Sequence, residues 1–506
     1  MALLPRPTTL DRPAPAEDTG PSQTPEAPQE SHGVLRSVWL WPVVATLACT
    51  VYGIRTPVMW EDELTSWDVA SRDLGQLLDT VQRVDAVLGT YYLLLHGWMT
   101  VFGDSATSLR LPSALAMAGA AGCAALCGQR LFGRRAGLAG GLLFALIPVV
   151  SRYAHEARPY ALVVCAVSLS TLLLLRALDR PGSRRRWAAY ALGVAAVGLF
   201  HLLALTVLLG HMVAVGSRVR AERRVLWGFG IAASVGVIGV VPVALLGRAQ
   251  TGRQISWIPR PDMWGLVAIW PQLFASATLA GAVIALAVTA WGERRSAALC
   301  CTAMAVLPPL VLWVVSHGQV SYFFYRYLLF TLPAWVMLAG AGLVAARSRA
   351  VVAAALVVLA VLTVREQQAL RKPFAHFSSG LDYPGAALTI EKFYQPGDAV
   401  IYDRGDDSWR MLDVGVRFYL PDDLRMHDVF LAESSADRDD LRPTECGDPG
   451  ACLRGDKRVW LVVSGNWGDP FRELPDYQER ALRARYTAYG SAHVTGITVT
   501  LLELKA

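Results

Sequence analysis

Strings typical of soluble nucleotide and metal enzymes are missing from this sequence. It has no P-loop, and no GxGxxG-type string opens a helix. Its histidines and cysteines do not recur at the spacing of a metal site. Charged residues make up only 17% of the chain, and the basic ones form short separate patches instead of one broad surface. These absences argue against a nucleotide cofactor, a sugar-nucleotide enzyme of the cytoplasm and a nucleic-acid partner.

Hydrophobic residues, by contrast, make up 54% of the chain and are gathered into long runs. Seven of these runs approach or exceed the ~20 residues needed to cross a bilayer core. They lie at 38–54, 111–129, 159–177, 226–247, 263–290, 297–315 and 325–345. Shorter runs lie at 89–103, 136–151 and 350–365, and the run 187–217 fits either one helix or a tight pair. The sequence therefore predicts an α-helical polytopic membrane protein.

The N-terminal segment 1–36 differs from the rest. It is rich in Pro, Ser, Thr, Glu and Gly, with no hydrophobic run and no cleavage pattern, so we predict a disordered cytoplasmic tail. Only four of the 47 basic residues are lysines. A chain this rich in arginine and alanine is typical of GC-rich coding sequence, and we predict a bacterial plasma membrane.

Arginine patches at 130–135, 180–186, 218–224, 294–295 and 347–349 set the orientation. The positive-inside rule places them in the cytoplasm, so an even number of crossings separates each patch from the next. Run 187–217 is then two helices that turn near His201. Run 89–103 must not cross, and we predict an interfacial helix in a first outer loop, 55–110. Eleven spans remain in a transmembrane domain, 37–365.

The region 366–506 is polar and contains short strand-like strings at 398–402, 458–463 and 493–503. We predict an extracytoplasmic α/β domain. Cys446 and Cys452 are separated by five residues, GDPGA, and the oxidising exterior favours a disulfide between them. Two free thiols are the alternative.

The predicted topology gathers polar residues at the outer face. They are Glu61, Asp62 and Glu63 after the first span, Arg152, His155, Glu156 and Arg158 at the next outer turn, and then His201, His317 and Arg326. Three consecutive carboxylates repel one another, which favours a raised pKa or a cationic neighbour. The alternatives are a solvated acidic loop or a helix N-terminus for the first group. An ion pair between Glu156 and Arg158, a snorkelling Arg326 and a packed His201 would explain the others without function.

Four strings carry a family resemblance. They are WEDELTSWD with Asp62 and Glu63, the segment from Asp85 through GTYYLLLHGW to FGDSATSLRLPSAL, YAHEARPYAL, and YRYLLFTLP. In this order they resemble the membrane-embedded GT-C glycosyltransferases. They are most similar to the bacterial group related to protein O-mannosyltransferases and the aminoarabinose transferases of lipid A. The family usually has Pro-Pro before its Tyr-rich helix, whereas this chain has DAVLGTYY.

The resemblance implies transfer of a mannose- or arabinose-type sugar, with inversion, from a polyprenyl-phosphate donor to a hydroxyl of a glycan, lipid or protein acceptor. A phosphate ester is a good leaving group, so one carboxylate base and one or two cations suffice. Asp62 corresponds to the base and Glu63 to its orienting or acceptor-binding partner. Glu156, Arg158 and Asp85 fall in the family's outer motifs, Arg326 is the candidate for the donor phosphate, and His201 has a marginal role.

Two other functions are compatible with a polytopic chain, and a metal cofactor is left open. A lipid or solute transporter would show internal repeats and charges at the membrane midplane, and the sequence shows neither, with Pro271 the one obvious helix interruption. A scaffold gives no reason for acidic and basic residues to converge at one face. The three adjacent carboxylates have the oxygen ligands that a divalent cation prefers.

Overall fold

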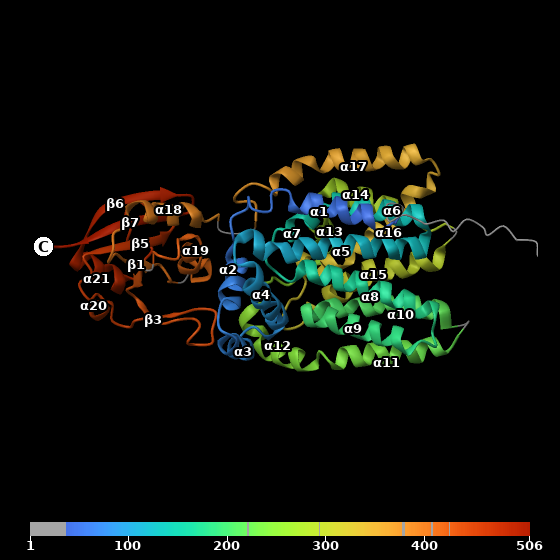
Figure 1. Cartoon of the computed structure of the whole chain (residues 1–506), viewed down its shortest axis with the longest axis horizontal. Coiled ribbons are helices and arrows are strands. Elements are labelled where there is room, and N and C mark those ends of the chain that lie inside the picture. Colours follow the sequence, from blue (N-terminus) through green and yellow to red (C-terminus); the bar gives the residue numbers. More distant parts are fainter. Residues whose placement is uncertain (1–36, 220–221, 293, 377–379, 406–407, 425) are drawn as a thin grey trace, which may run out of the picture. The chain divides into compact units, whose positions relative to one another are not determined.

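The structure is a computed structural model that describes residues 37–219, 222–292, 294–376, 380–405, 408–424 and 426–506. The predicted cytoplasmic tail, 1–36, lies outside the described residues. A long helical portion is followed by an α/β domain, as Figure 1 shows. The predicted fold class, a polytopic helical protein with a C-terminal α/β domain, is confirmed.

The helical portion runs from α1 to α17. Its α-helices are α1 (Leu40–Val51), α2 (Glu61–Ala70), α3 (Leu74–Arg83), α4 (Gly89–Phe102), α5 (Ala106–Phe132), α6 (Arg134–Leu146), α7 (Pro148–Ala154), α8 (Tyr160–Asp179), α9 (Arg184–Phe200), α10 (Val207–Val219), α11 (Arg224–Ile238), α12 (Val241–Gln254), α13 (Met263–Phe274), α14 (Ala277–Thr289), α15 (Arg295–Val315), α16 (Leu332–Ala345) and α17 (Arg349–Ala369). Short 3-10 helices are η2 (Ala86–Leu88), η3 (Leu202–Thr206) and η4 (Tyr325–Thr331).

Six helices in the described part of the chain are long and apolar enough to cross a membrane, and three bent helix pairs raise the number to nine. Helices α1 and α9 are shorter. The eleven predicted spans would require both of them to cross as well, so that count stays a prediction. The predicted turn at His201 is confirmed, because α9 ends at Phe200 and His201 has extended backbone.

The run 263–290, predicted as one span, consists of two helices that differ in direction by 99°, which is the geometry of a broken span or a re-entrant loop. Pro271 lies in the last turn of α13, and Ala275 has left-handed backbone with φ of 52°. Ser276 then caps α14 by accepting a hydrogen bond from the N–H of Leu279. Proline and a left-handed residue together end the first helix, which is the physical reason for the bend.

Helix α4 corresponds to the predicted interfacial helix. It is too short to be a candidate span, and Figure 1 shows it with α2 and α3 at one end of the helical bundle. Its His96 bonds through Nδ1 to the carbonyl oxygen of Ala70 at 2.9 Å, and Trp98 Nε1 donates to the carbonyl of Ser108 at 2.9 Å. These bonds hold α4 against the end of α2 and the start of α5. We call this part of the bundle the site end.

Glycines allow the central helices to touch through their backbones. A Cβ atom added to Gly340 of α16 would lie 2.5 Å from the carbonyl oxygen of Ala136 in α6. One added to Gly140 of α6 would lie 2.5 Å from the carbonyl oxygen of Val336 in α16. Small residues at such crossings are typical of helix packing in membranes, where close van der Waals contact drives association. We call this contact the glycine seam.

The C-terminal domain contains α18 (Tyr383–Phe393), α19 (Leu412–Tyr419), α20 (Pro449–Cys452) and α21 (Asp476–Arg485) with two sheets. The larger sheet has the order β2 (His427–Asp428), β1 (Ala399–Tyr402), β5 (Arg458–Ser464), β7 (Ile497–Leu504) and β6 (Tyr486–Val494). Strand β1 is parallel to β2 and β5, whereas β7 is antiparallel to β5 and β6. The smaller sheet pairs β3 (Leu431–Glu433) with β4 (Thr444–Glu445).

Both faces of the larger sheet are covered. In β5, Trp460 and Val462 pack in the cluster that contains α18, α19 and residues of α2 and α4. Val459 and Leu461 point to the opposite cluster, which includes Leu482 of α21. Alternation of this kind is the period-2 pattern of a strand buried on both sides. One face of the domain therefore shares its core with the site end.

The sequence also predicted a disulfide in this region and a domain boundary before it. Cys446 and Cys452, for which the sequence favours a disulfide, are joined by one in the structure. The boundary expected at 365 falls inside α17, which continues to Ala369. The membrane portion and the α/β domain are connected by the segment between α17 and α18.

Candidate active site

The site begins at the acidic string of α2. Trp60 has extended backbone, and helix α2 starts at the next residue with Glu61, Asp62 and Glu63 in its first turn. Carboxylates are favoured there because the free N–H groups of the helix carry partial positive charge. Successive residues of a helix point about 100° apart, so the three side chains have different surroundings. Asp62 keeps 30% of its side chain exposed, whereas Glu63 is fully buried.

Glu63 is held by Arg110 of α5. The Arg110 guanidinium donates from Nε to Oε1 at 2.8 Å and from Nη2 to Oε2 at 2.6 Å, and both side chains are fully buried. Glu63 Oε1 also accepts the N–H of Ala157 at 2.8 Å. Arg110 Nη1 donates to the carbonyls of Ile54 and Pro57. This network joins α2, α5, the 54–58 segment and the turn before α8.

Asp62 faces two arginines from distant parts of the chain. Arg326 Nη1 donates to Asp62 Oδ2 at 3.1 Å, and Arg158 Nη2 lies 3.7 Å from the same oxygen. Arg158 also donates from Nη1 to the carbonyl of Asp62 and to Ser66 Oγ, at 3.2 and 3.3 Å. Both guanidinium side chains are about one-tenth exposed. The convergence of Asp62, Arg158 and Arg326 expected from the topology is therefore present.

Aromatic rings surround the Arg326 guanidinium. Its Cζ lies between 5.1 and 5.9 Å from the ring centres of Trp60, Tyr160, Trp257, Phe324 and Tyr327. Rings at this distance attract a cation through their quadrupoles. They also exclude water, which strengthens any charge interaction at the site. Arg326 is thus a fixed positive charge on η4, and it is enclosed by rings from η4 and its N-cap, from the first residue of α8, and from the segments before α2 and α13.

The turn 155–159 brings Arg158 to Asp62. Pro159 disfavours helical backbone in the residue before it, so α7 ends at Ala154 and α8 starts at Tyr160. His155 Nε2 bonds to the carbonyl oxygen of Thr50 at 2.7 Å. Ser113 Oγ donates to the carbonyl of Glu156 at 2.7 Å. These bonds anchor the turn to α1 and α5.

Glu156 and Arg158 do not pair with each other. Glu156 Oε1 accepts from Arg152 Nε at 3.2 Å, and its Oε2 has no hydrogen-bond partner among the described residues. Burial raises the pKa of Glu156 to about 7, although Arg152 acts to lower it. Burial likewise lowers the pKa of His155 to about 4. Both groups are therefore held towards their neutral forms.

Glu156 should make stability depend on pH. Its pKa of about 7 lies above the ordinary 4.5, so its stabilising contribution is complete below pH 4.5 and is lost as the pH rises to 7. At 1.4 kcal/mol per pH unit the loss is on the order of 3 kcal/mol. We expect the thermal midpoint of Glu156→Gln in detergent to fall less than that of the wild type across this interval. The exposed Glu391→Gln is the control, and equal pH profiles for all three proteins would contradict the prediction.

Known proteins resemble this chain in sequence and in fold. A family model described as dolichyl-phosphate-mannose-protein mannosyltransferase matches residues 90–245. The crystal structure of ArnT from Cupriavidus metallidurans in the apo state gives a TM-score of 0.58 at 16% identity, covering 91% of this chain and 97% of that one. ArnT bound to undecaprenyl phosphate gives the same TM-score and identity, covering 93% and 98%. This chain has the GT-C fold.

Two further comparisons gave a weaker structural match and no sequence match. The Archaeoglobus fulgidus oligosaccharyltransferase in complex with Zn and sulfate gives a TM-score of 0.47 at 11% identity, covering 92% of this chain and 73% of that one. A search of curated protein sequences found no match.

The other expected site residues also lie near Asp62 and the two arginines. Asp85 is buried and accepts a hydrogen bond from Tyr92 Oη at 2.6 Å. His201 lies against the rings of Tyr160 and Tyr327, with ring centres 6.3 and 5.1 Å away, and burial lowers its pKa to about 4. His201 thus packs against two of the rings that surround Arg326. Arg110 was not expected, although a charged residue at the start of an apolar run was the signal that could have found it.

The acidic string does not form the cation site that its three adjacent carboxylates suggested. Both oxygens of Glu63 bind Arg110, and Asp62 faces two guanidinium groups. No cluster of three or more His, Cys, Asp or Glu side chains that could hold a metal was found in the described residues. The carboxylates point apart because they are successive residues of one helix, so these oxygen atoms do not fit a metal ion.

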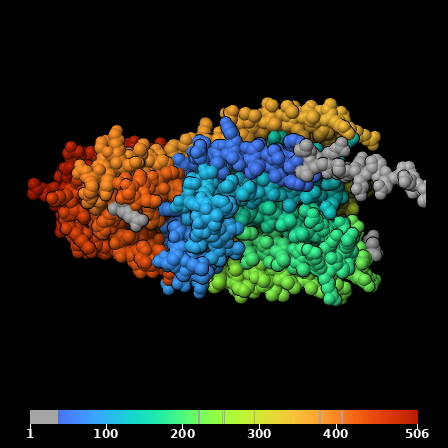
Figure 2. Space-filling view, viewed as in Figure 1, coloured from blue at the N-terminus to red at the C-terminus, as the bar shows by residue number. Residues whose placement is uncertain are grey.

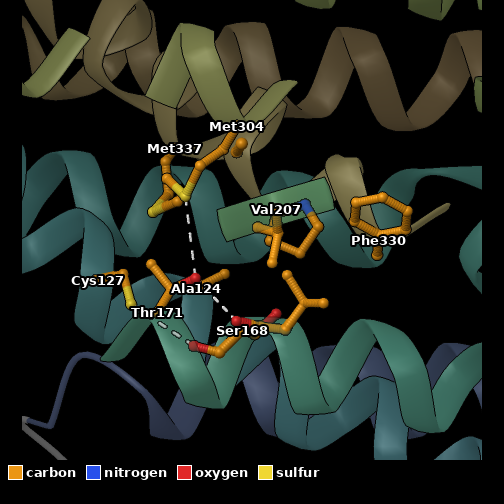
Figure 3. Close-up of a pocket in the computed structure, with 11 residues that line it drawn as sticks. Ala124, Cys127, Ser168, Thr171, Val207, Met304, Phe330 and Met337 are labelled. Atoms are coloured by element: carbon orange, nitrogen blue, oxygen red, sulfur yellow. Dashed lines mark hydrogen bonds between the residues drawn. The ribbon is translucent and has the colours of Figure 1, made fainter. Parts of the chain in front are cut away.

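A small cavity lies inside the bundle, lined by residues that include Cys127, Ser168, Thr171 and Met304, as Figure 3 shows. Its volume is ≈ 10 Å³, room for about one water molecule. Beside it, Thr171 Oγ1 donates to the carbonyl of Val167 and so accepts from His211 Nε2 at 3.0 Å. The cavity is therefore a packing gap. The bond between His211 and Thr171 joins α10 to α8.

Proposed function

We propose that this protein is a membrane glycosyltransferase that uses a polyprenyl-phosphate-linked sugar of mannose or arabinose type. The observation that carries the proposal is the half-buried Asp62 carboxylate, held between Arg326 and Arg158 at the site end. The GT-C fold supports this reaction class, and one ArnT structure with that fold is bound to undecaprenyl phosphate. The acceptor is a hydroxyl of a glycan, lipid or protein.

The ion pair between Asp62 and Arg326 suggests how the donor would bind. A guanidinium group matches a phosphate as well as it matches a carboxylate, because its planar N–H groups can donate in parallel. The donor phosphate would take the place of Asp62 on Arg326, with Arg158 close by. Asp62 would then lose its partner Arg326, and its carboxylate oxygen would be available to the acceptor hydroxyl.

The bond changes follow from these positions. Asp62 removes the proton from the acceptor hydroxyl, and the acceptor oxygen forms a bond to the anomeric carbon of the sugar. The bond from that carbon to the phosphate oxygen breaks, and its electron pair leaves with the lipid phosphate. Arg326 and Arg158 stabilise the negative charge that develops there. A single displacement of this kind inverts the anomeric centre.

Glu63 and Glu156 would have indirect roles. Glu63 has both oxygens bound and no exposed surface, so we assign it to orienting α2 instead of to the acceptor. Glu156 holds Arg152 at the turn that presents Arg158. Asp85 and Tyr92 would support the loop that faces Asp62.

The site end would face away from the cytoplasm, and the membrane would be the plasma membrane. The arginines at 130–135 and 184–186 lie at the ends of α5, α6 and α9 that are remote from the 155–159 turn. The positive-inside rule therefore favours a cytoplasmic position for those ends and an outward position for Asp62 and the α/β domain.

Purified protein supplied with labelled polyprenyl-phosphate mannose or arabinose, and with glycan, lipid and protein acceptors, tests the proposal. We expect the wild type to transfer label from at least one donor. Arg326→Ala should reduce kcat/KM about 10²-fold, because the departing phosphate loses its cation. The exposed Arg260→Ala is the matched control and should keep wild-type activity. A wild type that transfers no label, but moves lipid or solute across vesicles, would be a transporter instead.

A further inference from the structure

The C-terminal domain touches the helix that carries Asp62. Asp68 lies six residues after Asp62 on α2, about 9 Å further along the helix axis. Its side chain is 8% exposed and forms an ion pair with Arg417 of α19. Asp68 Oδ2 also accepts from Arg72 Nη2 at 2.9 Å and from Ser435 Oγ at 3.3 Å. A buried carboxylate of the catalytic helix is thus neutralised partly from the other domain.

Two neighbours of Arg417 reach the same helix. Tyr419 Oη accepts the backbone N–H of Met59 at 2.9 Å, two residues before α2 begins. Phe418 packs edge-on against Trp67 with ring centres 5.0 Å apart. Three consecutive residues of α19 therefore contact the chain just before α2 and near the end of α2. Asp62 lies between these two points.

The loop between β3 and β4 adds a second strip of contact. Arg72 Nη2 donates to the carbonyl of Asp440 at 2.9 Å, and Arg83 of α3 pairs with Asp439 at 3.0 Å. Arg72 also donates from Nη1 to Thr80 Oγ1 at 2.7 Å, which joins α2 to α3. In Figure 2 the orange surface of the C-terminal domain adjoins the blue surface of this region. The contact is polar at its edge and apolar at Trp67.

Such support matters because α2 has only ten residues. Helices this short are marginal on their own and depend on tertiary contacts. On one side α2 is fixed by the ion pair of Glu63 with Arg110, and on the other by α19. A base must hold its position to about half an ångström for efficient proton transfer.

We propose that Arg417 and Tyr419 are positioning residues that set the place of Asp62 through Asp68 and Met59. The C-terminal domain is then part of the active site, and its separation from α2 disables transfer while donor binding at Arg326 continues. The catalytic part of this proposal rests on the proposed function.

The experiment compares full-length Arg417→Ala, Tyr419→Phe and the double variant with the wild type. Displacement of a catalytic group by about 1 Å can cost 10²-fold in rate. We expect kcat to fall about tenfold in each single variant and further in the double, with the KM for donor within about twofold of the wild type. Arg417→Lys should recover part of kcat. Arg483→Ala removes an exposed arginine that pairs with Asp469 and Glu479 in the same domain, and it should behave as the wild type.

Amide hydrogen exchange gives a readout that does not depend on transfer. The peptide that covers 57–66 should exchange faster in Tyr419→Phe, because the Met59 N–H loses its hydrogen-bond acceptor. Its exchange rate should be unchanged in Arg483→Ala. If the wild type transfers no sugar, the proposed function fails and exchange alone decides whether α19 holds α2. If the wild type is active, Asp62→Asn is inactive and both single variants keep wild-type kcat, the positioning proposal is wrong.

Discussion

Asp62→Asn should reduce kcat by about 10²–10⁴-fold, the usual contribution of a general base. The amide is nearly the same size as the carboxylate but cannot accept the acceptor proton. Its Oδ1 can still accept from Arg326, which donates to the carboxylate at 3.1 Å in the wild type. The donor site should therefore remain formed, and the KM for donor should stay close to the wild-type value.

Initial rates of label transfer at saturating acceptor measure this effect. Asp79→Asn makes the same chemical change at an exposed position of α3 and should leave kcat unaltered. A thermal scan of both variants shows whether the loss comes from unfolding. An Asp62→Asn protein that keeps more than about a tenth of wild-type kcat would remove Asp62 from the role of base.

Glu63→Ala should lower the free energy of unfolding by about 3–5 kcal/mol, because it leaves the Arg110 guanidinium buried without its counter-charge. Both partners have no exposed side-chain surface, so water cannot replace the lost carboxylate. The N–H of Ala157 loses its acceptor as well. The turn that carries Arg158 should loosen, and activity should fall together with stability.

The thermal midpoint in detergent is the measurement for this pair. Glu63→Leu combined with Arg110→Met should recover part of the loss, since no single buried charge remains. Recovery should be incomplete, because the carbonyls of Ile54 and Pro57 lose their donor. The exposed Glu433→Ala, which breaks a surface pair with Arg438, should cost at most about 1 kcal/mol. A Glu63→Ala midpoint equal to that of Glu433→Ala would contradict the prediction.

Local patterns in the sequence were sufficient for much of the helical layout. Arginine parity predicted the turn at His201 and a short non-crossing helix where the structure has α4, because both predictions depend on run length and charge placement. The same parity brought Asp62, Arg158 and Arg326 to one end of the bundle. Hydropathy alone could not predict the break between α13 and α14, since apolar residues dominate both helices, and Pro271 was the one local signal of it.

The ion pairs between side chains were harder to predict from the sequence. Glu63 and Arg110 are 47 residues apart, and Arg417 and Asp68 are 349 apart. Many arginines were available to the acidic string, and only the packed backbone decides which of them reaches which carboxylate. Glu63 was accordingly grouped with Asp62, although their surroundings in the structure are opposite.

The glycine seam has a consequence for how the bundle accepts sequence change. Its contacts are between backbones, so even alanine, the smallest side chain beyond glycine, would press α6 and α16 apart. Helix α16 continues directly from η4, which carries Arg326. A methyl group at Gly340 would thus shift Arg326, which lies fourteen residues earlier in the chain. Random mutagenesis of this seam should yield inactive proteins whose altered residue never meets a substrate.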